Sequence, residues 1–254
     1  MTIVLIAQNT FREAIRDRVL AGLVVAGLVL LVLTQVARPL AMGEGTRLTV
    51  DLGLTAITLL GMLAVLMVGT SLVAKEIERR TIFNLVSRPL PRPFYLVGKW
   101  LGLSSALWTV ALALGTGLWL VVVVLGHAGH TLAIVEAVYM AGLELTLVTA
   151  IAVLFSSLST PVLSSLYTLG AFLAGQWCDD LRAFAAKAPP ALAAMLNGAA
   201  NVVPNLTLFN MRALAANGEP TTPIHLGVAT AYALLYCGCV LALAAAAFES
   251  RDFK

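Results

Sequence analysis

Charged residues are scarce in this sequence: only 11% of its 254 residues are Asp, Glu, Lys or Arg, whereas 60% are hydrophobic. A soluble domain carries about 25% charged and about 45–50% apolar residues. A chain with so little charge cannot cover a soluble fold with a polar surface, so the composition excludes that class. Lipid is the expected solvent, and each membrane span requires about 20 apolar residues.

Cysteine and histidine are scarce as well, with three of each. Cys237 and Cys239 lie two apart on an expected helix and point away from each other, so the cysteines predict packing and no disulfide or metal site. His127 and His130 in "HAGH" could share one helical turn, but zinc or copper needs a third or fourth ligand. We expect no bound metal, with a two-histidine site as the alternative.

Motifs for nucleotide hydrolysis and for hydrolase chemistry are missing too. Gly98-Lys99 precedes Trp100 and lacks the upstream glycine and the following Ser or Thr of a Walker A loop. There is no Gly-x-Ser-x-Gly elbow and no His-Glu-x-x-His. An intramembrane hydrolase needs a base at membrane depth, whereas the histidines lie near the ends of the apolar runs. The sequence predicts no catalytic residue, no cofactor on this chain and no enzyme activity.

Long apolar runs are what the sequence has instead. They predict helices, because backbone amides in lipid must be satisfied within their own segment. The expected fold is a single all-α membrane domain over residues 1–254, with six transmembrane helices. The spans are expected at about residues 19–37, 53–74, 100–125, 132–155, 160–178 and 224–248.

Basic residues are distributed unevenly between the two sides that six spans create. Eleven of the 16 Lys and Arg residues fall on the side that carries both termini and segment 75–99. Short loops rich in Lys and Arg stay in the cytoplasm. The distribution therefore predicts that both termini are cytoplasmic and that segment 179–223 is extracytoplasmic.

Residues 1–18 precede the first span and have an amphipathic pattern. Ala7, Phe11, Ala14 and Ile15 recur at helical spacing, and polar side chains take the other face. This pattern predicts a helix that lies in the membrane interface. A polar lead-in without membrane contact is the alternative.

The densest cluster of charge and proline is "KEIERRTIFNLVSRPLPRPFYLVGK", residues 75–99. Apolar side chains at helical spacing over 82–86 follow a charged head, which predicts a short helix on the membrane surface. Alternating prolines over 89–93 then end regular helix. We expect the chain to return into the membrane at Gly98-Lys99, with Lys99 snorkelling to the interface and Trp100 beside it.

Two carboxylates fall within the expected span 132–155. Glu136 is expected near the outer headgroups and Glu144 deeper, where ionisable residues are costly and often functional. Two interpretations of Glu144 stay open: it lines a translocation path, or it pairs with a Ser, Thr or Trp of a neighbouring span. Asp179 and Asp180, just beyond the fifth span, predict a solvated edge.

Three stretches resemble the permease subunits of ABC type-2 transporters, in a branch that includes permeases of copper-enzyme maturation and gliding-motility systems. Segment 75–99 resembles the first cytoplasmic loop of that family. "VVPNLTLFNMR" (202–212) resembles its Pro-Asn…Phe-Asn segment before the last span, and "FESRDFK" (248–254) its short Phe-x-x-Arg-Asp ending. Arg79-Arg80 departs from the family, in which small residues often precede the Thr.

This resemblance implies a homodimeric permease of an ATP-driven exporter in the bacterial cytoplasmic (inner) membrane. Two copies of a separate cytoplasmic ABC ATPase would bind ATP and Mg²⁺ and dock on a coupling helix within loop 75–99. An extracytoplasmic accessory protein is a further candidate partner, and no nucleic acid is expected. The residues assigned in this way are Lys75, Glu76, Glu78, Arg79, Arg80, Thr81 and Leu85 for docking, Pro89, Arg92, Gly98 and Lys99 for the loop break and return, and Pro204, Asn205, Phe209 and Asn210 for the extracytoplasmic motif.

A second hypothesis is a mechanotransmitting or regulatory membrane subunit of an ABC complex that moves no substrate itself. The scarcity of charge in the spans favours it, because polar substrates require a polar path. Neither hypothesis identifies a substrate, since copper, lipid, peptide and polysaccharide leave no recognisable pattern in this sequence.

Overall fold

The computed structural model describes residues 2–41, 43–69 and 92–249, and every regular element within these ranges is helical. This confirms the expected all-α membrane fold. Within the described ranges, five helices are long and apolar enough to cross a membrane. The elements are α1 (Thr2–Arg16), α2 (Arg18–Ala37), η1 (Arg38–Ala41), α3 (Gly45–Ala64), η2 (Val65–Gly69), α6 (Arg92–Val124), η3 (Ala128–His130), α7 (Thr131–Leu158), α8 (Pro161–Gln176), α9 (Cys178–Ala185), α10 (Pro190–Val202), η4 (Thr207–Phe209), α11 (Arg212–Asn217) and α12 (Pro223–Glu249).

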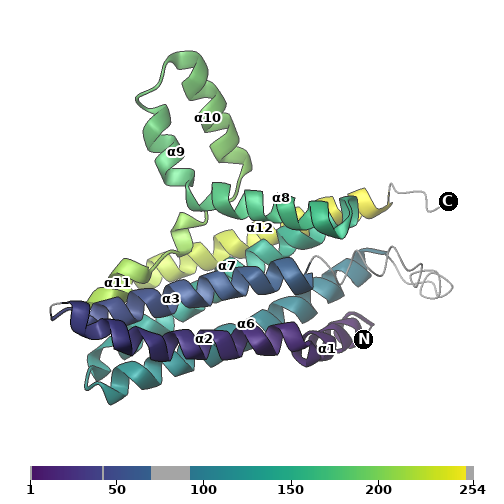
Figure 1. Ribbon diagram of the computed structural model, residues 1–254. Helices are drawn as coiled ribbons and strands as arrows, with labels where there is room; N and C mark the ends of the chain where they lie inside the picture. The colour runs from purple at the N-terminus through teal and green to yellow at the C-terminus, as the bar shows by residue number, and fades with distance from the viewer. Residues whose placement is uncertain (1, 42, 70–91, 250–254) are drawn as a thin grey trace.

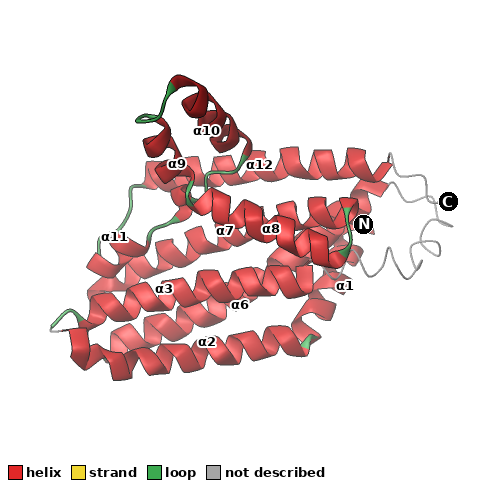
Figure 2. Cartoon of the chain, turned by 45° about the horizontal axis from the view of Figure 1, so that its top comes forward, coloured by secondary structure: helices red, strands yellow, loops and turns green. Residues whose placement is uncertain are grey.

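The long helices lie side by side in an elongated bundle, and α9 and α10 form a hairpin that projects from one flank (Figures 1 and 2). We name the two ends of the bundle the α1 end and the α11 end. The last helix, α12, begins at the α11 end and runs to the α1 end, so the first and last helices meet the same end (Figure 1). The α1 end contains Thr2–Arg16, Gly69 and Arg92, and the α11 end contains Arg38–Ala41, Ala128–His130 and Arg212–Asn217.

The chain between α7 and α12 crosses the bundle in two short pieces, which are α8 and the segment 203–211. Because α7 ends at the α1 end and α12 begins at the α11 end, residues 159–222 must cross the bundle once more. α8 begins with Pro161 and stops before Trp177, and its 16 residues make it about 24 Å long. That is shorter than a hydrocarbon core of about 30 Å. α8 occupies the predicted span 160–178, whereas the hairpin and the segment 203–211 fall within the predicted segment 179–223.

α7 is the most enclosed of the long helices. In its most apolar stretch 78% of the residues are buried, against 22% in α2. Small residues permit this packing: a Cβ on Gly142 would lie 2.6 Å from the Trp108 ring, and one on Gly61 would lie 2.5 Å from Leu145 Cδ1. Polar side chains at the centre of α7, such as Thr149, are therefore held among other helices.

α1 crosses the α1 end of the bundle and packs against the beginning of α6 (Figure 1). Gly98 and Gly102 lie one helical turn apart on the contact face. A Cβ on Gly98 would lie 2.8 Å from Ile6 Cγ2, and one on Gly102 would lie 2.4 Å from the carbonyl oxygen of Ala7. Two small residues at this spacing let helix backbones approach closely. A helix is thus present where residues 1–18 predicted one, but one of its faces is buried against protein.

Lys99 lies inside α6, and the prediction that it snorkels to the interface is wrong. α6 already begins at Arg92, and the Lys99 side chain is only 5% exposed because α1 covers it. Its Nζ lies 3.9 Å from Glu13 Oε2 on α1. Trp100 is also directed inward, and its Nε1 donates to the carbonyl oxygen of Thr146 on α7 at 3.1 Å.

The cysteines pack largely as predicted. Cys178 and Cys237 are buried, whereas Cys239 is exposed on α12. The burial of Cys237 brings its thiol to within 3.8 Å of the Thr146 carbonyl oxygen. Cys239 points away from the protein because it lies two residues further along the same helix.

Candidate functional site

Glu144 lies in the middle of α7 and is only 3% exposed. Gln176, the last residue of α8, donates a hydrogen bond from Nε2 to Glu144 Oε1. The partner is therefore an amide on α8, and the predicted Ser, Thr or Trp partner is wrong. The bond ties the centre of the most buried helix to the point where the short helix stops.

A small cavity of about 10 Å³ adjoins the Glu144 carboxylate, which is room for about one water molecule. Arg212 lines the same cavity from the start of α11, so a cation faces the buried carboxylate. A nearby opposite charge offsets part of the cost of burying an ionised group. The cavity is lined by Leu54, Thr58, Ala137, Ala141, Glu144, Phe209, Asn210, Met211 and Arg212.

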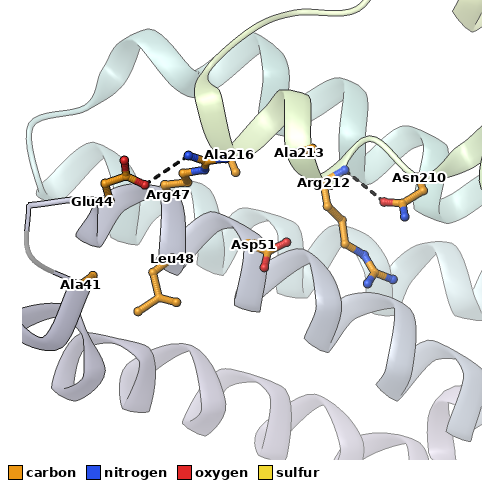
Figure 3. A pocket seen from close by; sticks show the side chains of 9 residues that line it. All are labelled: Ala41, Glu44, Arg47, Leu48, Asp51, Asn210, Arg212, Ala213 and Ala216. Atoms are coloured by element: carbon orange, nitrogen blue, oxygen red, sulfur yellow. Dashed lines mark hydrogen bonds and ion pairs between the residues drawn. The ribbon is translucent and has the colours of Figure 1, made fainter.

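An open cleft of about 600 Å³ lies at the α11 end, between α3 and α11. Figure 3 shows Asp51 on α3 facing this cleft and the Arg212 side chain extending alongside α3. Glu44 and Arg47 form an exposed ion pair of 3.2 Å at its rim. The cleft is lined by Ala41, Glu44, Arg47, Leu48, Asp51, Asn210, Arg212, Ala213 and Ala216.

Asn210 and Arg212 line both the cleft and the small cavity. The Asn210 side-chain oxygen accepts from the backbone N–H of Arg212 at 3.3 Å, which fixes the two residues relative to each other (Figure 3). These two residues therefore separate the open surface from the buried Glu144. We call Glu144, Gln176, Asn210 and Arg212 the Glu144 site.

The predicted extracytoplasmic motif closes the end of α8. The backbone N–H of Leu206 donates to the Gly175 carbonyl oxygen at 3.1 Å, and the N–H of Asn205 donates to the Tyr232 hydroxyl at 2.9 Å. Phe209 is 2% exposed and its ring centre lies 6.3 Å from that of Tyr232. Pro204 is buried beside Gly175, where a Cβ would lie 2.7 Å from the Pro204 carbonyl oxygen. Several backbone groups of this irregular segment thus have protein partners.

Asp179 contributes to this closure, which the prediction of a solvated edge missed. Its side chain is 61% exposed, yet Oδ1 accepts from Asn205 Nδ2 at 3.1 Å and Oδ2 accepts from the Thr207 hydroxyl. The carboxylate therefore connects the first turn of α9 to the segment that follows the hairpin. No local pattern reveals this, because the partners are 26 and 28 residues away.

Asp179→Ala is expected to lower stability by about 1 kcal/mol, because two hydrogen bonds to an exposed carboxylate are lost. Amide hydrogen exchange should also rise in residues 203–211 and stay unchanged in α7. Asp180→Ala is the matched control, since Asp180 is the adjacent exposed carboxylate. Equal exchange in the two variants would contradict an anchoring role for Asp179.

The remaining predicted site residues within the described part of the chain lie away from the Glu144 site. Lys75, Glu76, Glu78, Arg79, Arg80, Thr81, Leu85 and Pro89 lie outside the described residues, as does the predicted surface helix. Arg92 begins α6, and Gly98 and Lys99 hold α1 at the opposite end of the bundle. His127 lies at the α11 end, with Nε2 3.3 Å from the Thr46 hydroxyl, and the ring centres of His127 and His130 are 6.0 Å apart.

Comparisons with known proteins agree with this architecture. Comparison with curated protein sequences gave no significant match. The family model described as ABC-2 family transporter protein, however, matches residues 4–253, which is nearly the whole chain. Together with the five apolar helices, this match shows that the chain is a multi-pass membrane protein and belongs to the ABC-2 transporter family.

Proposed function

We propose that this chain is the permease subunit of an ATP-driven exporter, homodimeric and located in a bacterial cytoplasmic membrane. The observation that carries the proposal is the family match over residues 4–253. A separate ABC ATPase, in two copies, would bind ATP and Mg²⁺ and supply the energy. The basic α1 end would face the cytoplasm, and the α11 end would face outward.

The Glu144 site is the proposed part of the translocation path. Broken helices that end at a buried polar group are a common way to build a binding site at mid-membrane depth. Here α8 stops at Gln176, which contacts Glu144, and Asn210 and Arg212 line both the cavity at that carboxylate and the open cleft. Displacement of the 203–211 segment would connect the two spaces.

The coupling loop is proposed to act on α6 and α1 together. α6 begins at Arg92, seven positions after the last predicted docking residue, Leu85, and α1 is packed on Gly98 and Gly102. A push on the loop would therefore move α1 and α6 as one rigid body. This supports coupling from the predicted surface helix into the bundle.

A second copy of the chain is proposed to cover α8. Val162, Leu166, Leu173 and Trp177 share one face of this helix and its end, and they are 78%, 60%, 42% and 59% exposed. Such an apolar face suits either lipid or protein, and a short helix beside the Glu144 site is a suitable place for two copies to enclose a path. Homodimer formation stays a proposal.

The docking proposal is tested by replacing Glu76, Glu78 and Arg79 together with alanine. Co-purification of the cognate ATPase with the tagged permease is expected to fall at least about tenfold, because several charge-assisted contacts of about 1.5–3 kcal/mol each are lost. The matched control replaces Glu44, Arg47 and Asp51, which carry the same charges at the α11 end. Undiminished ATPase binding by the first variant would overturn the proposed docking role.

A mechanotransmitting subunit that moves no substrate is the second candidate function. The observation that favours it is the size of the cavity at Glu144, which has room for about one water. A structure of the dimer with ATP bound would separate the two functions. A continuous opening from the Glu144 site to the cleft supports transport, whereas a seam filled with side chains supports force transmission.

A further inference from the structure

α1 presents three distinct faces. Thr10 and Ala14 lie on the face against α6, and they are 1% and 0% exposed. A second face carries Val4, which is 69% exposed, together with Ile15, which is 38% exposed. Phe11 lies beside them and is half-buried. At 100° per residue Val4, Phe11 and Ile15 form one apolar strip with exposed Gln8 at its edge, and the residues that the structure describes leave this strip uncovered.

The third face of α1 is basic. Arg12 and Arg16 are exposed on it on either side of Leu5, which is 57% exposed, and Arg18 is exposed at the start of α2. The two neighbouring carboxylates are already engaged. Glu13 lies 3.9 Å from Lys99 Nζ, and Asp17 caps α2 by accepting from the Val19 N–H at 2.9 Å. The uncovered cations of this strip therefore favour an anionic partner.

We propose that α1 binds anionic phospholipid headgroups through Arg12, Arg16 and Arg18, with Val4 and Ile15 among the first acyl carbons. An apolar strip beside a basic strip, on a helix that crosses the end of a bundle, matches the boundary between acyl chains and headgroups. A soluble ATPase would leave Val4 and Ile15 without an apolar environment. Because Gly98 and Gly102 clamp α1 to α6, the lipid contact would hold the helix on which coupling is proposed to act.

The test uses the full-length protein in phosphatidylcholine nanodiscs prepared with and without phosphatidylglycerol. Native mass spectrometry of protein released from the discs measures the retained phosphatidylglycerol relative to phosphatidylcholine. Three variants are compared with the wild type: Arg12→Gln/Arg16→Gln, Arg12→Lys/Arg16→Lys, and the control Arg47→Gln/Lys187→Gln, which removes two exposed cations far from α1.

The glutamine variant is expected to lose preference for phosphatidylglycerol by about fivefold for each arginine removed, and salt should weaken binding to the wild type. The lysine variant and the control should behave like the wild type. Thermal unfolding in pure phosphatidylcholine should be equal for all four proteins, which separates lost lipid contact from lost folding. Unchanged lipid preference in the glutamine variant, or an equal loss in the control, would overturn the proposal. The proposal would also be overturned if the glutamine variant lost the bound cognate ATPase and kept the lipid preference of the wild type, because the basic face would then bind that protein.

Discussion

Glu144→Leu is expected to lower the free energy of unfolding by about 2–4 kcal/mol and to stop transport by the complex. The substitution leaves the Gln176 amide without its acceptor and Arg212 without the buried opposite charge. Removal of one partner from a buried polar pair is costly because the other partner stays desolvated. Thermal unfolding of the purified protein measures the first effect. ATP-dependent thiol labelling of Ala141→Cys, a buried position that lines the cavity at Glu144, with Cys239 replaced, measures whether the cleft still opens toward Glu144.

Glu144→Gln separates the two interpretations of this residue. The amide keeps the shape and a hydrogen bond to Gln176 but removes the charge that faces Arg212, so most of the stability should be retained. If the carboxylate serves the path, ATP-dependent labelling at position 141 is expected to fall well below that of the protein with Glu144 intact. Wild-type labelling together with wild-type stability would show that Glu144 serves packing alone.

Gly102→Leu is expected to detach α1 from the bundle. Even a Cβ at this position would lie 2.4 Å from the Ala7 carbonyl oxygen and 2.6 Å from Thr10 Cβ, and a backbone atom cannot yield as a flexible side chain can. Overpacking of this kind costs about 1–3 kcal/mol. Thermal unfolding should shift downward, and trypsin should cleave at Arg12 and Arg16 more rapidly than in the wild type.

Gly22→Leu is the control for this substitution. Gly22 lies on exposed α2, and a Cβ there would meet nothing within 4 Å. The control should match the wild type in stability and in protection from trypsin. Equal behaviour of Gly102→Leu and Gly22→Leu would contradict the close packing of α1 on α6.

The sequence predicted the helical class and most of the spans, because apolar runs of sufficient length have few other solutions. It could not predict what α8 contacts where it ends. The side chain of Gln176, the last residue of the helix, reaches Glu144 32 residues earlier in the chain. Such a contact joins distant segments, and no local periodicity encodes it.

The candidate site could likewise be predicted only in part from the sequence. Glu144 was recognisable from its place in an apolar run, whereas its partners Gln176 and Arg212 come from later elements that only the fold brings near. The burial of Lys99 is predictable from the sequence. Gly98 and Gly102 have the spacing of a close helix contact, and that signal stands in the sequence beside the lysine.

The bond between Leu206 N–H and the Gly175 carbonyl oxygen joins the two ends of the α9–α10 hairpin. A loop whose ends are already held together gains length at little entropic cost, about 0.6 kcal/mol for each doubling. Asp179 reinforces this junction near the base of the hairpin. Extra residues inserted at the turn over residues 186–189 would leave α8 and the segment 203–211 in their positions. That turn is thus a natural point for lengthening the protein outward, by gene fusion in the laboratory or by insertion during evolution.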